Sequence, residues 1–282
     1  PILFGLHSIY EWSHGTAGIE DEKARKLLEH KSVWLNPNAF GIRAVIYFAI
    51  WIALMFLLRK WSQRQDQTPE PNQALTWVQK SQNLSGPGFV IFGLAVTFAS
   101  VDWVMSLDAE WFSTIYGFIF VASWSLSALA FVIAAMAVLV KDQPLARIVK
   151  PLHFQDLGKL LLALVMLWAY FAFSQYLIIW SGNLPEEIVY YIERTHGIWG
   201  AVIIGIFLLH FAAPFLFLLS RGLKRDPGRL IIVALLVIVM RMVDLIWMLV
   251  PALHGPNRVW LDAIALLAFG GLWLGLFTWQ LG

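Results

Sequence analysis

Seven long apolar runs dominate the pattern of hydrophobic and polar positions along this chain, and each is bounded by charge or by Gly and Pro. A helix of about 20 apolar residues is long enough to cross a hydrocarbon core of about 30 Å. The runs lack the period-two alternation of barrel strands, and only helices and closed barrels pair all their backbone groups in lipid. The pattern therefore predicts an all-α fold, a polytopic transmembrane helix bundle of about seven spans. The predicted spans are approximately residues 39–58, 88–107, 112–140, 157–180, 197–220, 230–250 and 260–281.

Polar and turn-forming residues separate these runs. Residues 65–73 are polar with two prolines, residues 85–88 (SGPG) predict a turn into the second span, and residues 225–228 (RDPG) predict a break before the sixth. The segment 15–36 mixes acidic and basic residues, which favours a surface helix or an extramembrane loop. Residues 1–10 are apolar and indicate the end of an earlier span. We therefore expect an N-terminal segment over 1–38 and a transmembrane helical bundle over 39–282.

The composition agrees with a membrane location and excludes several kinds of chemistry. Only 13% of the residues are charged, against roughly 25% in an ordinary soluble domain, which is too few for a surface that faces water. The chain has no Cys, which excludes disulfides, thiolate-held iron–sulfur clusters and zinc–thiolate sites. A formal net charge of +2 gives no sign of a nucleic-acid partner.

Basic residues are distributed unequally between the two sets of loops. The links after the first, third and fifth predicted spans hold twelve Lys and Arg residues, whereas the opposite short loops hold only Arg194 and Arg258. The positive-inside rule places the loops with the twelve basic residues in the cytoplasm. The loops at 107–111, 181–196 and 251–259 are then expected to face outward.

Ionisable residues inside a span are energetically unfavourable and are functional candidates, and four of them stand out. Asp102 lies near the outer end of the second span, His210 near the middle of the fifth, and Arg241 and Asp244 within the sixth. Arg241 and Asp244 are three residues apart, so a helix puts them on one face and within pairing distance. The set is consistent with a proton relay, because a histidine exchanges protons near neutrality. It is also consistent with a buried salt bridge and a hydrogen-bonded histidine that only hold helices together.

A second polar set lies along the fourth predicted span. It comprises Tyr170, Gln175 and Tyr176 within the span, and His153, Asp156 and Lys159 at its cytoplasmic entrance. The entrance residues either start a proton path or are ordinary charged residues at the membrane interface, and the second case is more common. Gln175 and Tyr176 are able either to bind a quinone carbonyl or to hydrogen-bond between spans. A b-type haem normally needs two axial His at matching depth, and only His210 lies deep in a span, so this chain is a poor haem carrier.

Three strings carry a resemblance to a known family. They are residues 106–117 (SLDAEWFSTIYG), residues 168–176 (WAYFAFSQY) running on to 180–187 (WSGNLPEE), and residues 210–215 (HFAAPF). They resemble the second large membrane subunit of alternative complex III, the bacterial quinol:cytochrome c, or high-potential iron–sulfur protein, oxidoreductase. That subunit is related to the membrane subunits of polysulfide-reductase-type enzymes.

The resemblance implies a multisubunit electron-transfer complex in a bacterial inner membrane, within a respiratory or photosynthetic chain. Haem c and iron–sulfur clusters would lie on c-type cytochrome and iron–sulfur partner subunits, and quinol would bind the homologous sister membrane subunit. This chain would be cofactor-free and would offer a proton half-channel. The residues that would form it are Asp102, His210, Arg241 and Asp244. Family members have about ten spans, so we expect this sequence to be part of a longer fold. The other hypotheses are a stand-alone proton- or ion-coupled transporter and a purely structural membrane anchor.

Overall fold

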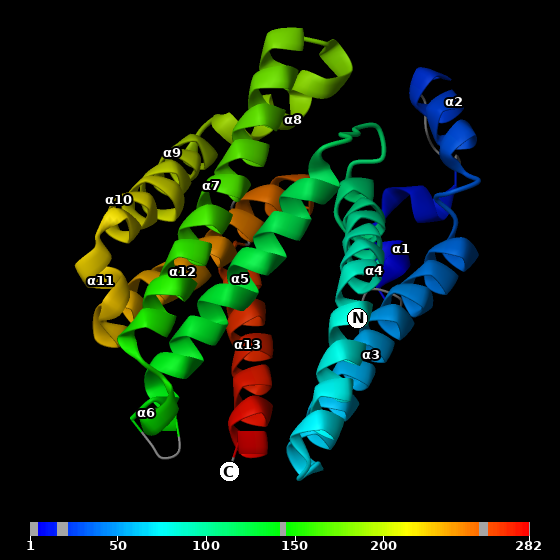
Figure 1. Ribbon diagram of the computed structural model, residues 1–282. Coiled ribbons are helices and arrows are strands. Elements are labelled where there is room, and N and C mark those ends of the chain that lie inside the picture. Colours follow the sequence, from blue (N-terminus) through cyan, green and yellow to red (C-terminus); the bar gives the residue numbers. More distant parts are fainter. Residues whose placement is uncertain (1–4, 16–21, 142–144, 254–258, 282) are drawn as a thin grey trace. The chain divides into compact units, whose positions relative to one another are not determined.

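Residues 5–15, 22–141, 145–253 and 259–281 are described by a computed structural model, and every regular element in this part of the chain is a helix (Figure 1). Among the described residues, seven helices are long and apolar enough to cross a membrane, which confirms the all-α polytopic fold. They are α3 (Pro37–Gln67), α4 (Pro71–Trp103), α5 (Tyr116–Leu139), α7 (Pro151–Gly182), the segment from α9 to α10 (Ile198–Leu219), α12 (Pro227–Leu253) and α13 (Val259–Leu281). Shorter helices are α1 (Leu6–Ile9), η1 (Glu11–His14), α2 (Glu22–Lys31), η2 (Met105–Leu107), α6 (Leu145–Ile148), α8 (Pro185–Thr195) and α11 (Arg221–Arg225).

Proline marks the beginning of five helices, at positions 37, 71, 151, 185 and 227. It suits the first helical turn because its missing N–H would have no partner there and its φ is already helical. The Asn36 side chain caps α3 by accepting a hydrogen bond of 2.8 Å from the Ala39 N–H. At the end of α7, Asn183 has φ 46°, the left-handed conformation that commonly terminates helices. The break predicted at residues 225–228 is confirmed, since α11 ends at Arg225 and α12 begins at Pro227.

The turn predicted at residues 85–88 is wrong, because these residues lie inside α4. Pro87 removes one backbone N–H from the helix interior, which normally kinks or breaks a helix. The helix continues here because it packs along α3, where buried Gly88 sits beside Leu54. Packing against a neighbouring helix outweighs the local turn signal. The polar connection predicted over 65–73 consequently shrinks to residues 68–70, between α3 and α4.

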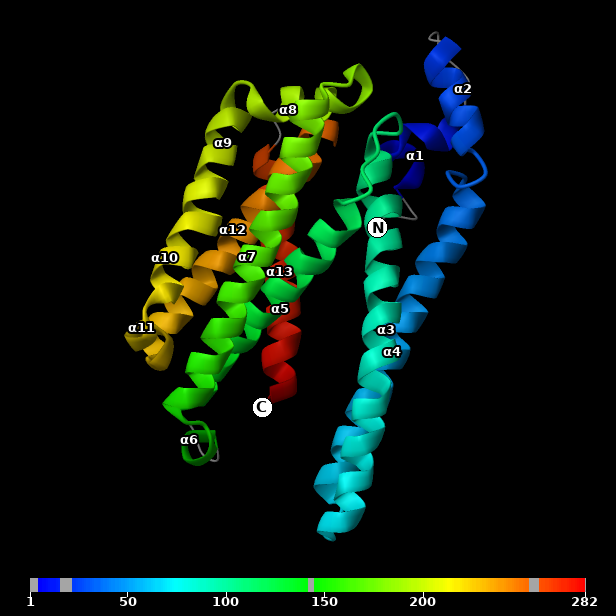
Figure 2. The ribbon, with the colours of Figure 1, turned by 45° about the horizontal axis from the view of Figure 1, so that its top comes forward.

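The chain forms two compact units, Pro1–Val121 and Ala122–Gly282, and the boundary falls within α5. In the first unit α3 and α4 run side by side as an antiparallel pair (Figures 1 and 2). The Tyr10 hydroxyl donates a hydrogen bond of 2.9 Å to the Trp103 carbonyl at the end of α4. An apolar cluster attaches α1, η1 and α2 to the start of α3, and its buried members are Leu6, Tyr10, Trp12, Leu28 and Phe40.

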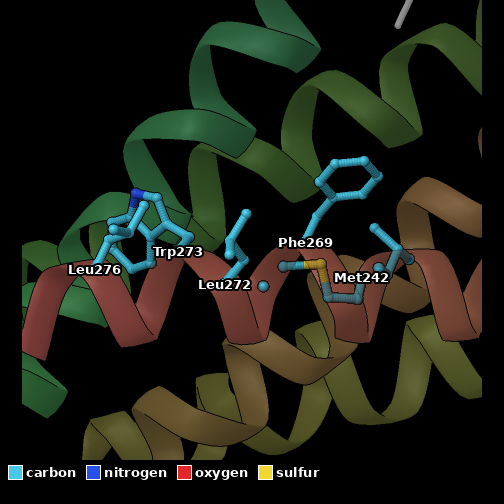
Figure 3. A pocket seen from close by; sticks show the side chains of 7 residues that line it. Met242, Phe269, Leu272, Trp273 and Leu276 are labelled. Atoms are coloured by element: carbon cyan, nitrogen blue, oxygen red, sulfur yellow. The ribbon is translucent and has the colours of Figure 1, made fainter.

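In the second unit α7, the α9–α10 segment and α12 pack against one another, and α8 contacts all three (Figure 2). α13 contacts α12, and its Trp273 and Phe277 rings lie 4.9 and 5.1 Å from the Phe131 ring of α5. An open apolar groove of about 490 Å³ lies between α12 and α13 (Figure 3). Met242 lines it from α12, whereas Phe269 and Leu272 line it from α13. The groove holds no charged side chain and offers packing surface rather than chemistry.

Candidate functional site

His210 lies in a π-helical segment, Phe207–Ala212, in the middle of the fifth span. Pro214 explains this segment, because it has no N–H to donate to the carbonyl four residues earlier, which is that of His210. The π-helical segment shifts backbone pairing to five residues, as in the bond from the Ala213 N–H to the Leu208 carbonyl. Such segments inside α-helices are frequent at functional sites.

The wider turn also decides which way His210 points. Buried residues of this span recur every four positions, at Ile206, His210, Pro214 and Leu218. In a regular α-helix of 3.6 residues per turn, positions four apart drift around the axis by about 40° at each step. A turn with more residues reduces that drift. His210 therefore stays on the same buried face as its neighbours one turn before and after.

His210 is fully buried, and its ring meets the Trp168 ring of α7 edge-on at 4.2 Å between centroids. Neither Nδ1 nor Nε2 has a hydrogen-bond partner among the described residues. A neutral imidazole carries one donor and one acceptor. Each buried group left unpaired costs about 1–3 kcal/mol. His210 is therefore an unfavourable residue for packing alone.

Arg241 and Asp244 form the predicted ion pair on α12, between Nη1 and Oδ2, and both are buried. The Arg241 guanidinium is close enough to His210 to interact with it electrostatically. The Trp168 indole interacts with Asp244 without completing a hydrogen bond. Two spans thus bring a histidine, an arginine and a carboxylate together inside the second unit, and a third span adds Trp168. We name His210, Trp168, Arg241 and Asp244 the central polar cluster.

Asp102 occupies a separate and fully buried site in the first unit. Its Oδ1 accepts hydrogen bonds from Trp34 Nε1 at 2.8 Å and from Arg43 Nη2 at 2.9 Å. Its Oδ2 accepts from Arg43 Nε at 2.8 Å and from the Tyr47 hydroxyl at 2.7 Å. A carboxylate has about four lone-pair sites, so the bonding capacity of Asp102 is filled. This carboxylate joins the segment before α3, α3 itself and α4, and we name the group the Asp102 lock.

The structure therefore divides the four predicted relay residues between the two units, with Asp102 in one and His210, Arg241 and Asp244 in the other. Arg43 is the partner of Asp102 that the sequence pattern did not reveal. A signal was present, because Arg43 is a charged residue inside the first predicted span, and charges within membranes are usually paired. The ion pair between Arg43 and Asp102 explains why both charges are tolerated inside a span, and it requires no movement of protons.

The secondary candidates within α7 lie on different faces. Gln175 is buried and donates from Nε2 to the Tyr191 hydroxyl of α8 at 3.2 Å. Tyr176 packs edge-on against the same Tyr191 ring at 5.1 Å. Burial raises the pKa of Tyr191, and the neighbouring Tyr190 adds to that rise, so the phenol stays protonated at neutral pH. Tyr170, by contrast, is 65% exposed and points away from the unit.

The entrance candidates make ordinary local contacts at the start of α7. His153 Nδ1 accepts a hydrogen bond of 3.1 Å from the Lys150 N–H and so caps the helix. Asp156 and Lys159 form an exposed ion pair of 2.9 Å one helical turn apart. Such contacts are typical of charged residues at a membrane interface. A role of these three residues in a proton path stays a prediction.

Arg194 is a buried polar residue that the sequence placed in an outward loop with Arg258, which lies outside the described residues. It belongs to α8 and donates to the Tyr190 carbonyl at 3.0 Å and to the Met248 carbonyl of α12 at 3.2 Å. Its guanidinium lies 3.7 Å from the centroid of the Tyr190 ring. In return, Trp247 Nε1 donates to the Arg194 carbonyl at 3.0 Å. Arg194 thus fastens α8 to the last turns of α12, where a positive charge interacts favourably with the helix dipole.

In the part of the chain that the structure describes, no group of three or more His, Cys, Asp or Glu residues is placed to hold a metal ion. Comparison of the sequence with protein-family models found no matching family, and comparison with curated proteins found no match. The fold, the three strings of residues and the two polar sites are therefore the observations that bear on function.

Proposed function

We propose that this chain is a multi-pass membrane subunit of a bacterial quinol:electron-acceptor oxidoreductase complex that resembles alternative complex III. In this proposal the chain carries no redox centre, supports assembly and supplies part of a proton path. Haem c and iron–sulfur clusters belong to partner subunits, and quinol is oxidised on the homologous membrane subunit. The seven membrane-spanning helices and the strings 106–117, 168–187 and 210–215 support the proposal.

The buried state of His210 is the observation that carries the proton path. In the Asp102 lock, every bonding site of the buried carboxylate is filled by a side chain of this chain. His210 is the opposite case, because both ring nitrogens lack a partner among the described residues while the residue is fully buried. Keeping such a group is unfavourable for stability, which favours a function that needs its nitrogens available.

The central polar cluster contains the groups that a proton relay needs. The imidazole of His210 can take up a proton on one nitrogen and release it from the other. Asp244 is a carboxylate acceptor, and the adjacent Arg241 stabilises its charge in a low-dielectric setting. Asp244 lies one helical turn nearer than Arg241 to the end predicted to face outward. In this proposal, protons move outward from His210 to Asp244 through bridging water.

Purification in a mild detergent tests the assignment to a complex. The expected result is co-purification with c-type cytochromes and iron–sulfur proteins, and with quinol oxidation activity. A single monodisperse chain without these partners would contradict it and would favour the transporter hypothesis.

Proton movement is tested in the same complex, reconstituted into vesicles that carry an internal pH dye. His210→Leu removes the two unpaired nitrogens, so the protein is expected to fold at least as stably while the protons moved per quinol oxidised decrease. His30→Leu is the matched control, because His30 is an exposed histidine on α2, outside the spans. Asp244→Asn removes the proposed carboxylate acceptor and is tested in the same assay. Unchanged proton movement with intact quinol oxidation in both His210→Leu and Asp244→Asn would refute the relay.

A further inference from the structure

The α3–α4 pair is longer than a bilayer is thick. α3 has 31 residues and α4 has 33, or about 46 and 50 Å at 1.5 Å per residue, whereas the hydrocarbon core spans about 30 Å. The apolar run of α3 ends at Leu58 and that of α4 begins near Gly88. The two helices stay side by side to their shared turn at residues 68–70 (Figure 2). Their ends therefore project from the membrane on the side predicted to be cytoplasmic.

Four exposed basic residues lie on this projecting part, namely Arg59, Lys60, Arg64 and Lys80. Among the described residues, none of the ion pairs found in the structure includes any of these four. Other exposed basic residues, such as Lys26 and Lys159, do have a carboxylate partner. The projecting part thus holds positive charge that the chain itself does not neutralise.

Trp77 gathers two of these charges from different helices. The Arg64 guanidinium of α3 lies 4.9 Å from the centroid of the Trp77 ring, and the Lys80 ammonium of α4 lies 4.2 Å from it. Lys60 is one helical turn before Arg64 on the same face of α3. Like charges held this close repel each other unless an anion lies between or beside them. The Trp77 ring positions the two cations, and the anion that neutralises them comes from outside the chain.

The depth and direction of Lys60 and Arg64 match a lipid headgroup layer. Arg64 is six residues past Leu58, which is about 9 Å along the helix, and the headgroup layer occupies roughly 5–8 Å beyond the core. Side chains tilt toward the N-terminus of their helix, and α3 reaches this side with its C-terminal end. Lys60 and Arg64 therefore lean back toward the bilayer, and an indole such as that of Trp77 is typical of the interface.

We infer that Arg64 and Lys80, which meet at the Trp77 ring, bind the phosphate headgroup of an anionic phospholipid together with Lys60, one helical turn before Arg64. Asp66 and Glu70 lie at the tip of the hairpin, and the Glu70 carboxylate accepts a hydrogen bond from Gln73. Their negative charge repels an anion that approaches from the tip. The headgroup therefore binds from the membrane side, toward which Lys60 and Arg64 lean. This lipid site is independent of the proton path and of the proposed complex.

Native mass spectrometry of the purified protein tests the site, with phosphatidylglycerol and phosphatidylcholine as the two probes. We expect Arg64→Gln/Lys80→Gln to weaken phosphatidylglycerol binding about 30-fold, the factor for two basic side chains at about 1 kcal/mol each. Phosphatidylcholine binding is expected to stay unchanged. The matched control is Arg25→Gln/Lys26→Gln, which removes the same charge from α2 and is expected to have no effect.

Three results would overturn the inference. One is equal affinity of the native protein for the two lipids, and another is unchanged phosphatidylglycerol binding in Arg64→Gln/Lys80→Gln. The third is displacement of phosphatidylglycerol by inorganic phosphate at equal concentration, which would identify a site for free phosphate instead. Arg64→Lys/Lys80→Arg keeps both charges and is expected to bind as the native protein does.

Discussion

Replacing Asp102 with Asn removes the charge at the centre of the Asp102 lock and almost preserves its shape. The Asn Oδ1 can accept at most two of the four hydrogen bonds that Asp102 receives. The new amide group then faces N–H and O–H donors from Trp34, Arg43 and Tyr47. The variant should therefore weaken the attachment of α4 to α3 and to the segment before it.

The size of the effect follows from the hydrogen bonds that the Asn side chain cannot make. Hydrogen bonds to a charged acceptor contribute about 1.5–3 kcal/mol each, so the absence of two of them corresponds to about 3–6 kcal/mol. The Arg43 side chain is 14% exposed, so its unpaired guanidinium keeps some contact with polar surroundings. We therefore expect the lower end, about 3 kcal/mol, which agrees with the range for breaking one side of a buried ion pair.

The assay is reversible unfolding in mixed detergent micelles, followed by circular dichroism. Asp66→Asn is the control, because Asp66 is exposed at the hairpin tip, and it should change the free energy of unfolding by less than about 0.5 kcal/mol. A double-mutant cycle with Arg43→Gln should show coupling of about 1–3 kcal/mol. A decrease below about 1 kcal/mol for Asp102→Asn, or additive effects in the cycle, would refute the lock.

Three further predictions concern positions set by packing. Pro214→Ala should let the π-helical segment close toward an α-helix and shift the imidazole nitrogen resonances of His210, whose signals are identified by their absence in His210→Leu; an unchanged spectrum would disprove the role of Pro214. Arg194→Met should lower the free energy of unfolding by about 3–6 kcal/mol, because it removes two hydrogen bonds from a charged donor to backbone carbonyls. The detergent assay measures this, and an unchanged stability would contradict the attachment of α8 to α12 by Arg194. Gly117→Ala should destabilise by about 1–3 kcal/mol, because the added methyl group overlaps the Thr97 side chain; adding Thr97→Ala should restore part of the stability in the same assay, and failure to do so would exclude that clash as the cause.

The two buried polar sites explain why the function of an intramembrane charge is hard to assign from sequence. Asp102 and His210 are equally anomalous as residue types inside an apolar run. Their difference lies in the number of bonds each makes within the described part of the chain, four for Asp102 and none for the His210 ring nitrogens. That number depends on side chains from other helices. The sequence could therefore identify both residues as candidates without distinguishing a lock from a relay.

The sequence by itself determined the helical spans and the contacts that lie within one helix. Membrane crossing depends on apolar length and on backbone pairing inside the segment, both of which are local. The Arg241–Asp244 pair was predictable for the same reason, because a spacing of three residues places both side chains on one face.

Only the tertiary structure decided which residues surround Asp102 and Arg194. The partners of Asp102 are 55, 59 and 68 residues away in the sequence, and Arg194 reaches a carbonyl 54 residues away. The continuation of α4 through Pro87 also depends on α3. Contacts between helices depend on how their faces pack, and no local pattern contains that information.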